Sequence, residues 1–126
     1  MAINPDDATP IYLQIAQDIR HQILIGTLKE GDRIMSTTEY ATTYRINPAT
    51  AQKAFGLLID EALVEKRRGI GTFVAAGARE RIERAGRASY LEETLAPALE
   101  SGRALGLSAD EILNLARTTL MKEAGK

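Results

Sequence analysis

Two helix starts separated by a short turn constrain most strongly what this chain can fold into. Residues 36–39 form a capping box, in which the Ser36 side chain caps the first turn and Glu39 reaches back to the cap. Asn47 and Pro48 form the second start, because asparagine is a strong helix cap and proline loses no hydrogen bond at the first helical position. Two helices joined by so short a turn are typical of a helix-turn-helix. The start of the first helix could then bind an anion such as a backbone phosphate.

The second helix, expected from Asn47 to about Glu61, combines an apolar side with a polar N-terminal end. Its apolar residues recur at helical spacing and are Ala51, Ala54, Phe55, Leu58 and Ile59. The side chains near its N-terminus lie mostly off that side and are Ala49, Thr50, Gln52 and Lys53. Small and amide side chains at a helix N-terminus suit base edges in the DNA major groove. The pattern alone also fits an ordinary amphipathic helix, so the neighbouring segments must decide.

A β-hairpin with a basic tip is expected directly after the helix pair. Residues 63–67 and 72–74 are β-prone and surround a turn that contains Gly69 and Gly71. Three positive charges gather at the tip, on Lys66, Arg67 and Arg68. A basic hairpin behind a helix-turn-helix predicts a winged helix, whose wing can follow the phosphates or enter the minor groove. By itself, the basic run would also fit a solvated surface hairpin.

An amphipathic helix is expected ahead of the helix-turn-helix. Thr9 and Pro10 predict its start by the same cap-then-proline pattern, and Gly26 predicts its end. Isoleucines four residues apart form one side, at Ile11, Ile15, Ile19 and Ile23, with Ala16 beside them. His21 is the only histidine, and we expect it at a solvated helix position rather than in a metal or catalytic site.

Beyond the small-residue junction at residues 75–78, the sequence predicts two further helices. Apolar residues from Ile82 to Leu99 fall near one side of the first, and Pro97 should kink or restart it. A second capping box at residues 108–111 starts the last helix. We expect the surplus apolar surface to form a two-fold dimer; the alternative is that both helices pack back on the winged helix in a monomer. The residues expected at the dimer interface are Leu91, Leu95, Leu99, Ile112, Leu115 and Leu120.

The composition is that of a globular protein without disulfides. Of the 126 residues, 44% are hydrophobic and 26% are charged, and there is no cysteine. No signal peptide or membrane-spanning run is visible, so we expect a cytoplasmic protein without membrane contact. The net charge is −1, so any DNA binding must come from local clusters of positive charge. No catalytic triad, metal-ligand set or phosphate loop is present, and the sequence predicts neither an enzyme nor a cofactor.

Several motifs together resemble the GntR family of bacterial transcriptional regulators. They are Gly31-Asp32-Arg33-Ile34, Ser36 with Glu39-Tyr40-Ala41, Ile46-Asn47-Pro48-Ala49-Thr50, and Gly69-Ile70-Gly71-Thr72-Phe73-Val74. The Asn-Pro-x-Thr-x-x-Lys form of the second helix and the short tail are similar to the YtrA subfamily. The likeness covers nearly the whole chain after residue 9.

The resemblance implies a dimeric winged helix that represses a neighbouring operon, which in this subfamily often encodes an ABC transporter. It implies contacts with DNA at Ser36, Thr38, Asn47, Ala49, Thr50, Gln52, Lys53, Arg68 and Gly69. Thr38 and Pro48 stand where many members of the family have arginine, which suggests fewer phosphate contacts and a greater reliance on dimerisation. The tail is shorter than the effector domain of the larger subfamilies, so a small-molecule effector is left open.

Together, the residues and the resemblance predict a mainly α-helical protein with a small β-hairpin. A winged helix-turn-helix at residues 8–76 is followed by a short two-helix C-terminal dimerisation tail at residues 79–124. The predicted function is that of a homodimeric, sequence-specific repressor on an inverted-repeat operator; the alternative is a winged-helix module that binds protein and not DNA. The predicted contacts with double-stranded DNA are Ser36, Thr37, Thr38, Arg45, Asn47, Pro48, Ala49, Thr50, Gln52, Lys53, Arg67, Arg68, Gly69 and Gly71.

Overall fold

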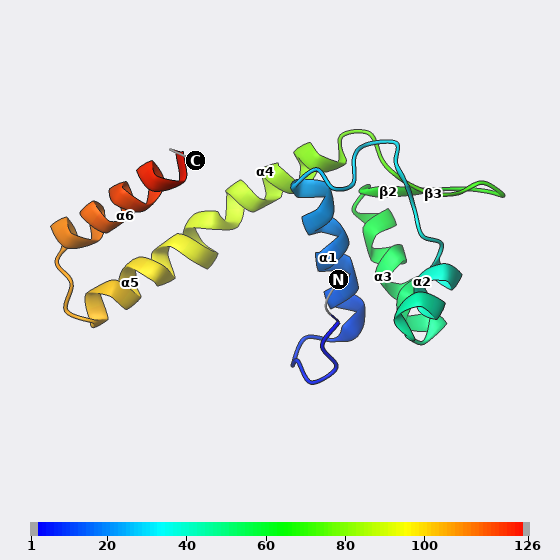
Figure 1. The fold of residues 1–126 in the computed structure, drawn as a ribbon, viewed down its shortest axis with the longest axis horizontal. Coiled ribbons are helices and arrows are strands. Elements are labelled where there is room, and N and C mark those ends of the chain that lie inside the picture. The colour runs from blue at the N-terminus through cyan, green and yellow to red at the C-terminus, as the bar shows by residue number, and fades with distance from the viewer. Residues whose placement is uncertain (1–2, 125–126) are drawn as a thin grey trace. The chain divides into compact units, whose positions relative to one another are not determined.

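The computed structural model describes residues 3–124 (Figure 1). The chain divides between Arg84 and Ala85 into two compact units. The elements of the first unit are α1 (Ile11–Leu24), β1 (Arg33–Ile34), α2 (Thr37–Tyr44), α3 (Pro48–Asp60), β2 (Val64–Arg67) and β3 (Gly71–Val74). The helix α4 (Ala78–Tyr90) begins in the first unit and ends in the second. The remaining elements are the π-helix η1 (Leu91–Leu95), α5 (Ala96–Ala104) and α6 (Ala109–Ala124).

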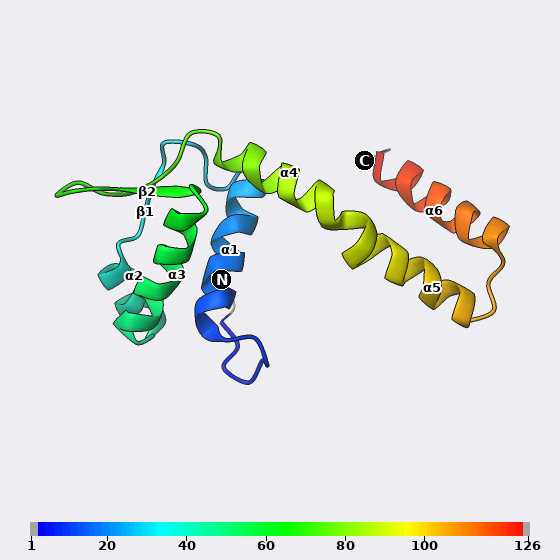
Figure 2. The ribbon, with the colours of Figure 1, turned by 180° about the vertical axis from the view of Figure 1, so that it is seen from behind.

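The core of the first unit lies between α1, α3 and the sheet, and α1 and α3 run side by side (Figures 1 and 2). Three of the isoleucines predicted on one side of α1 are buried, namely Ile15, Ile19 and Ile23, whereas Ile11 is half-buried. They meet a buried set on α3 that consists of Ala51, Ala54, Phe55 and Leu58. Ile59, predicted on the same side of α3, is 41% exposed. Burial of these aliphatic side chains is the main favourable contribution to folding of this unit.

The start of α1 differs from the prediction that Thr9 caps a helix with Pro10 in its first turn. Pro10 is itself the cap residue, with φ −53° and ψ 145°, and no side chain caps this helix. The Thr9 carbonyl instead accepts a hydrogen bond of 2.8 Å from Nε2 of Gln14. The predicted end of the helix is confirmed, because Gly26 follows the last turn with φ +86°.

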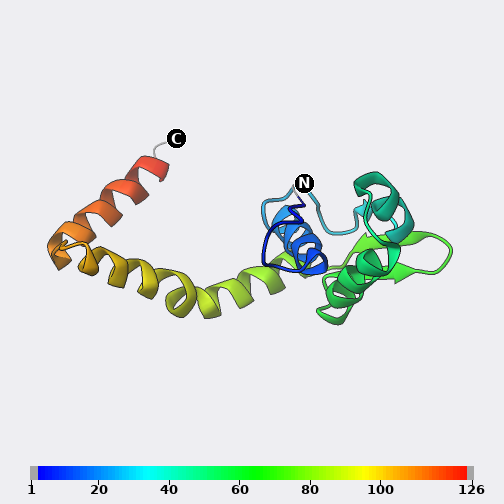
Figure 3. The same cartoon turned by 90° about the horizontal axis from the view of Figure 1, so that it is seen from below.

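The sheet has three strands in the order β1-β3-β2, where the sequence predicted only the β2–β3 hairpin. Arg33 pairs with Phe73 and Ile34 with Thr72, antiparallel. The hairpin itself is confirmed, with Val64 opposite Val74 and Arg67 opposite Gly71. Its tip projects beyond the helices in all three views (Figure 3).

The second unit consists of a long helical segment and the returning helix α6 (Figure 3). The sequence predicted that Pro97 would kink or restart the helix, and the structure shows a restart. The proline lies in the first turn of α5, and the backbone widens into the π-helix η1 just before it. The predicted capping box is confirmed: Ser108 Oγ accepts a hydrogen bond of 3.1 Å from the N–H of Glu111, and the Ser108 N–H donates one of 3.1 Å to Glu111 Oε1. Within the described residues, no helix is long and apolar enough to cross a membrane.

Candidate nucleic-acid interface

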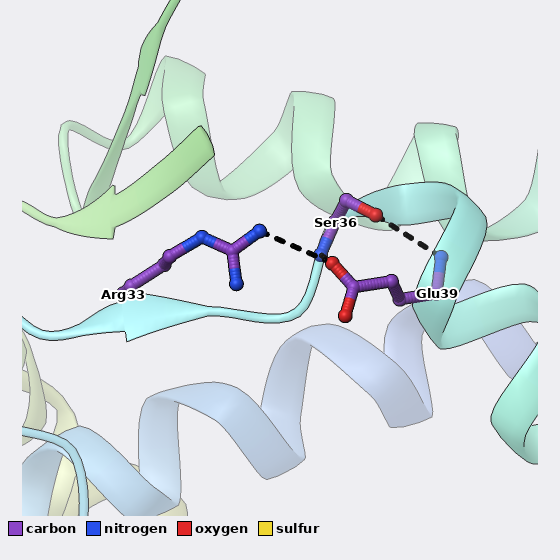
Figure 4. A network of polar contacts seen from close by, with 3 residues as sticks. All are labelled: Arg33, Ser36 and Glu39. Atoms are coloured by element: carbon purple, nitrogen blue, oxygen red, sulfur yellow. Dashed lines mark hydrogen bonds and ion pairs between the residues drawn. The ribbon is translucent and has the colours of Figure 1, made fainter. Parts of the chain in front are cut away.

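The N-terminus of α2 is fixed by the capping box that the sequence predicted (Figure 4). Ser36 Oγ accepts a hydrogen bond of 3.1 Å from the N–H of Glu39, and the Ser36 N–H donates one of 3.3 Å to Glu39 Oε1. The hydrogen bonds from the Ser36 backbone and hydroxyl hold the pKa of Glu39 below its ordinary value, and the charge of Arg33 lowers it further. The capping box therefore satisfies backbone N–H groups at the helix start that carries Ser36, Thr37 and Thr38.

Arg33 attaches this helix start to the sheet. Its Nη2 lies 3.2 Å from Glu39 Oε1, so that Glu39 joins Ser36 and Arg33 (Figure 4). The shaft of the same arginine lies over Gly71: a Cβ atom at that position would come within 2.8 Å of Arg33 Nε. An exposed ion pair contributes little free energy by itself. The pair joins β1 to the first turn of α2.

The turn between α2 and α3 depends on one residue in an unusual conformation. Arg45 has φ 53° and ψ 50°, the left-handed region, and its N–H donates to the Ala41 carbonyl. In the predicted cap of α3, Asn47 Oδ1 accepts a hydrogen bond of 2.8 Å from the N–H of Ala49, and Pro48 is the first helical residue. Gln52 is exposed one turn further along the helix. The sequence predicts Arg45 as a DNA contact and does not indicate its left-handed conformation in the turn.

Two of the predicted basic contacts are engaged within the protein. Lys53 Nζ lies 4.1 Å from the centre of the Tyr12 ring. The Arg67 guanidinium forms an ion pair of 2.9 Å with Glu65 and lies 4.3 Å from the centre of the Phe73 ring. Cation–π contacts of this kind fix the direction of a flexible side chain. Arg68, at the tip of the hairpin, is exposed.

The start of α2, the exposed side of α3 and the hairpin together border an open groove of about 530 Å³. Seven of the predicted contacts line it, namely Ser36, Thr37, Thr38, Gln52, Arg67, Gly69 and Gly71. The other predicted contacts lie on the surface outside it, and these are Arg45, Asn47, Pro48, Ala49, Thr50, Lys53 and Arg68. The groove also includes six residues absent from the predicted contacts, which are Phe55, Gly56, Ile59, Lys66, Ile70 and Thr72. The sequence predicts Lys66 only as one of the three positive charges at the hairpin tip. The alternation of side chains along a strand could have placed it on the groove side of the sheet.

A helix-turn-helix followed by a basic hairpin, with polar side chains at the start of its second helix, defines the winged-helix class of DNA-binding domains. Residues 11–74 match the family model of bacterial regulatory proteins of the gntR family. The chain therefore belongs to the GntR family of transcription regulators, and its relatives are regulators rather than enzymes, as the sequence predicted.

Two relatives come from Bacillus subtilis (strain 168). The chain is 40% identical to the HTH-type transcriptional repressor YtrA over 77 residues, which cover 61% of this chain and 59% of YtrA. It is 34% identical to the HTH-type transcriptional regulator YhcF over 109 residues, which cover 86% of this chain and 88% of YhcF. The match to YtrA thus spans about three fifths of that protein, and the match to YhcF nearly all of it.

Solved structures agree with this assignment. A GntR family transcriptional regulator from Listeria monocytogenes matches with a TM-score of 0.70 and 28% identity, over 90% of this chain and 97% of the other. The DNA-binding domain of AraR in complex with operator ORX1 matches with a TM-score of 0.53 and 27% identity, over 60% of this chain and 93% of the other. The fold predicted from the sequence is therefore confirmed, with one strand added.

Proposed function

We propose that this protein is a homodimeric, sequence-specific repressor that binds an inverted-repeat operator in double-stranded DNA. The observation that carries the proposal is the groove, because three elements that can contact a duplex border the same open space. Two further facts support it: the relative YtrA is a transcriptional repressor, and the similar AraR domain forms a complex with its operator. The proposed place of action is the cytoplasm.

In this proposal α3 is the recognition helix. Gln52 is exposed, so its amide can make the paired hydrogen bonds that identify adenine. Ala49 and Thr50 offer methyl groups that suit the methyl group of thymine. The start of α2 and the tip of the hairpin hold the phosphates on either side. The two half-sites would lie about one helical turn apart, roughly 34 Å.

The second unit supplies the dimer interface in this proposal, as part of a tail at residues 79–124 that follows a winged helix at residues 8–76. Large apolar side chains of the predicted interface are exposed, including Leu91 at 59%, Leu115 at 57% and Leu120 at 71%. Leu95 and Ile112 are half-buried, and a Cβ atom at Gly102 would come within 3.1 Å of Ile112. So many exposed apolar side chains favour an interface in which a second copy of the chain covers them.

The target that we propose is the operon next to the gene of this protein, with an ABC transporter as the first product to examine. The resemblance to the YtrA subfamily supports this choice. A small-molecule effector is not part of the proposal.

Binding to a labelled duplex from upstream of its own gene, measured by fluorescence anisotropy with an unrelated duplex as competitor, tests the function. We expect preferential binding to the upstream duplex with two chains per duplex. Equal affinity for the two duplexes would contradict sequence-specific binding. Absence of binding to either duplex would favour the alternative, a winged helix that binds protein.

A further inference from the structure

We propose that Lys66 is a DNA-contacting residue, and that it binds a backbone phosphate from within the groove while Arg67 holds the wing together. The proposal rests on the DNA binding proposed above. It reverses the expectation from the sequence, which placed Arg67 among the contacts and left Lys66 out.

The register of the sheet places Lys66 and Arg67 on opposite faces. Lys66 pairs with Thr72, and Thr72 pairs with Ile34, so these three side chains share one face of the sheet. Thr72 is 6% exposed and Ile34 is 7% exposed, because this face packs against the helices. Lys66 is exposed and continues the same face beyond the core, over the groove.

Arg67 lies on the other face, where it pairs with Gly71. There its guanidinium is occupied by the ion pair with Glu65 and by the ring of Phe73. Glu65 and Phe73 pair with each other across the two strands. Arg67 therefore joins neighbouring residues of the hairpin, and binding a phosphate would require it to give up a carboxylate partner.

Lys66 is free to bind an external anion. Within the described residues, its ammonium group has neither an ion pair nor a hydrogen bond. Its polar neighbours along the groove are Ser36, Thr37, Thr38, Gln52 and Thr72, which are neutral, and Arg67, whose charge is paired with Glu65. Because Arg67 is engaged, Lys66 is the available positive charge in a space that a polyanion would enter.

The chemistry of lysine favours a phosphate over a base. Its ammonium is a flexible point charge without the planar fork that reads two atoms of one base at once. A phosphate contact carries no sequence information but contributes affinity through the release of counterions. We therefore expect Lys66 to contribute equally on every duplex, whereas Gln52 contributes to choice between sequences.

The test compares Lys66→Gln with Arg67→Gln in the full-length protein, at several salt concentrations, on the upstream duplex and on an unrelated duplex of equal length. Lys66→Gln should weaken binding to both duplexes roughly four- to ten-fold, the share of one among several phosphate contacts. It should also reduce the slope of log affinity against log salt by about one per bound subunit. Arg67→Gln should leave this slope unchanged. Lys66→Arg keeps the charge and should restore the slope of the wild type.

Three results would overturn the assignment of Lys66: an unchanged slope in Lys66→Gln, a larger loss in Arg67→Gln, or an altered base preference in Lys66→Gln. Thermal unfolding of both variants by circular dichroism checks the fold, and exposed Lys66 should tolerate the change. Failure of the proposed function is a separate result, because the wild type would then bind neither duplex.

Discussion

Arg33 contacts three other residues of the first unit, and no sequence motif indicated this role. Its backbone pairs with Phe73, its guanidinium joins Glu39, and its shaft lies over Gly71. The backbone conformation of position 71 favours a glycine there. Gly71 has φ +142°, a conformation that other residues rarely adopt, and a side chain there would collide with Arg33.

We predict that Gly71→Ala destabilises the protein by about 1–3 kcal/mol, because it strains the backbone at a positive φ and forces the Arg33 side chain to shift. Gly56→Ala is the matched control: Gly56 lies inside α3, and a Cβ atom there would have nothing within 4 Å. The control should be neutral or stabilising by up to about 1 kcal/mol, from helix propensity. Urea unfolding followed by circular dichroism measures both, and equal effects of the two variants would refute the account of Gly71.

A second prediction at this scale concerns Gln52. Gln52→Ala should relax the preference at one base pair, at a cost of roughly 1–3 kcal/mol on the best site and little on other sequences. Selection of binding sites from a random duplex library measures the preference. Arg68→Ala is the contrast, because it should weaken binding to all sequences about equally. An unchanged preference after Gln52→Ala would remove this residue from the readers of bases.

At the scale of elements, the sequence could predict what depends on neighbours in the chain. Both capping boxes and the Asn47 cap were predicted correctly, because the cap and its partner lie within one helical turn. The buried side of α1 followed from the spacing of its isoleucines. The hairpin directly after α3 was also predicted, because its two strands are neighbours in the chain.

What depends on distant partners could not be predicted. The two residues of β1 are too few to show alternation, and the strand exists because Gly31 and Asp32 exchange backbone hydrogen bonds with Val74. Thr9 is not the cap because the helix begins one residue later, with the Pro10 carbonyl accepting from the N–H groups of Leu13 and Gln14. Strand alternation alone puts Lys66 and Arg67 on opposite faces, but the register of β2 against β3 was required to show that Lys66 shares the face of buried Thr72. Prediction of the candidate groove therefore required knowledge of tertiary contacts, which a run of basic residues does not give.

A third prediction concerns the start of α2. The folded state lowers the pKa of Glu39 from 4.5, so its ionised carboxylate adds stability above that pH, which is lost as the pH falls through the folded pKa. Glu39→Gln should therefore be less stable than the wild type at pH 7, and the gap should close as the pH falls below 4.5 and through the lowered pKa of folded Glu39. Glu100→Gln, an exposed glutamate of α5, controls for the loss of a charge. A gap that stays constant with pH would mean that the carboxylate charge does not stabilise this cap.

At the scale of the whole molecule, the two units differ in what they leave on the surface. The first unit buries an aliphatic core and exposes a groove lined by both polar and apolar residues. The second unit exposes large apolar side chains along α6, which are Leu113, Leu115, Leu120 and Met121. In the proposed repressor these surfaces act together, because each recognition helix reaches only one half-site and the dimer joins two of them.

Leu115→Glu tests that coupling, since it places a charge on the proposed dimer interface. Sedimentation velocity should show a shift from dimer to monomer, while Leu105→Glu, at a turn position 79% exposed and outside the predicted interface, should stay dimeric. Binding to a duplex with two half-sites should weaken roughly 10²- to 10⁴-fold, because the second subunit no longer binds at a high effective concentration. Binding to a single half-site should be unaffected, since the groove is intact. If Leu115→Glu stays dimeric, this residue does not lie in the dimer interface as proposed. If the monomer binds two half-sites as tightly as the dimer does, dimerisation through the second unit does not contribute to operator binding.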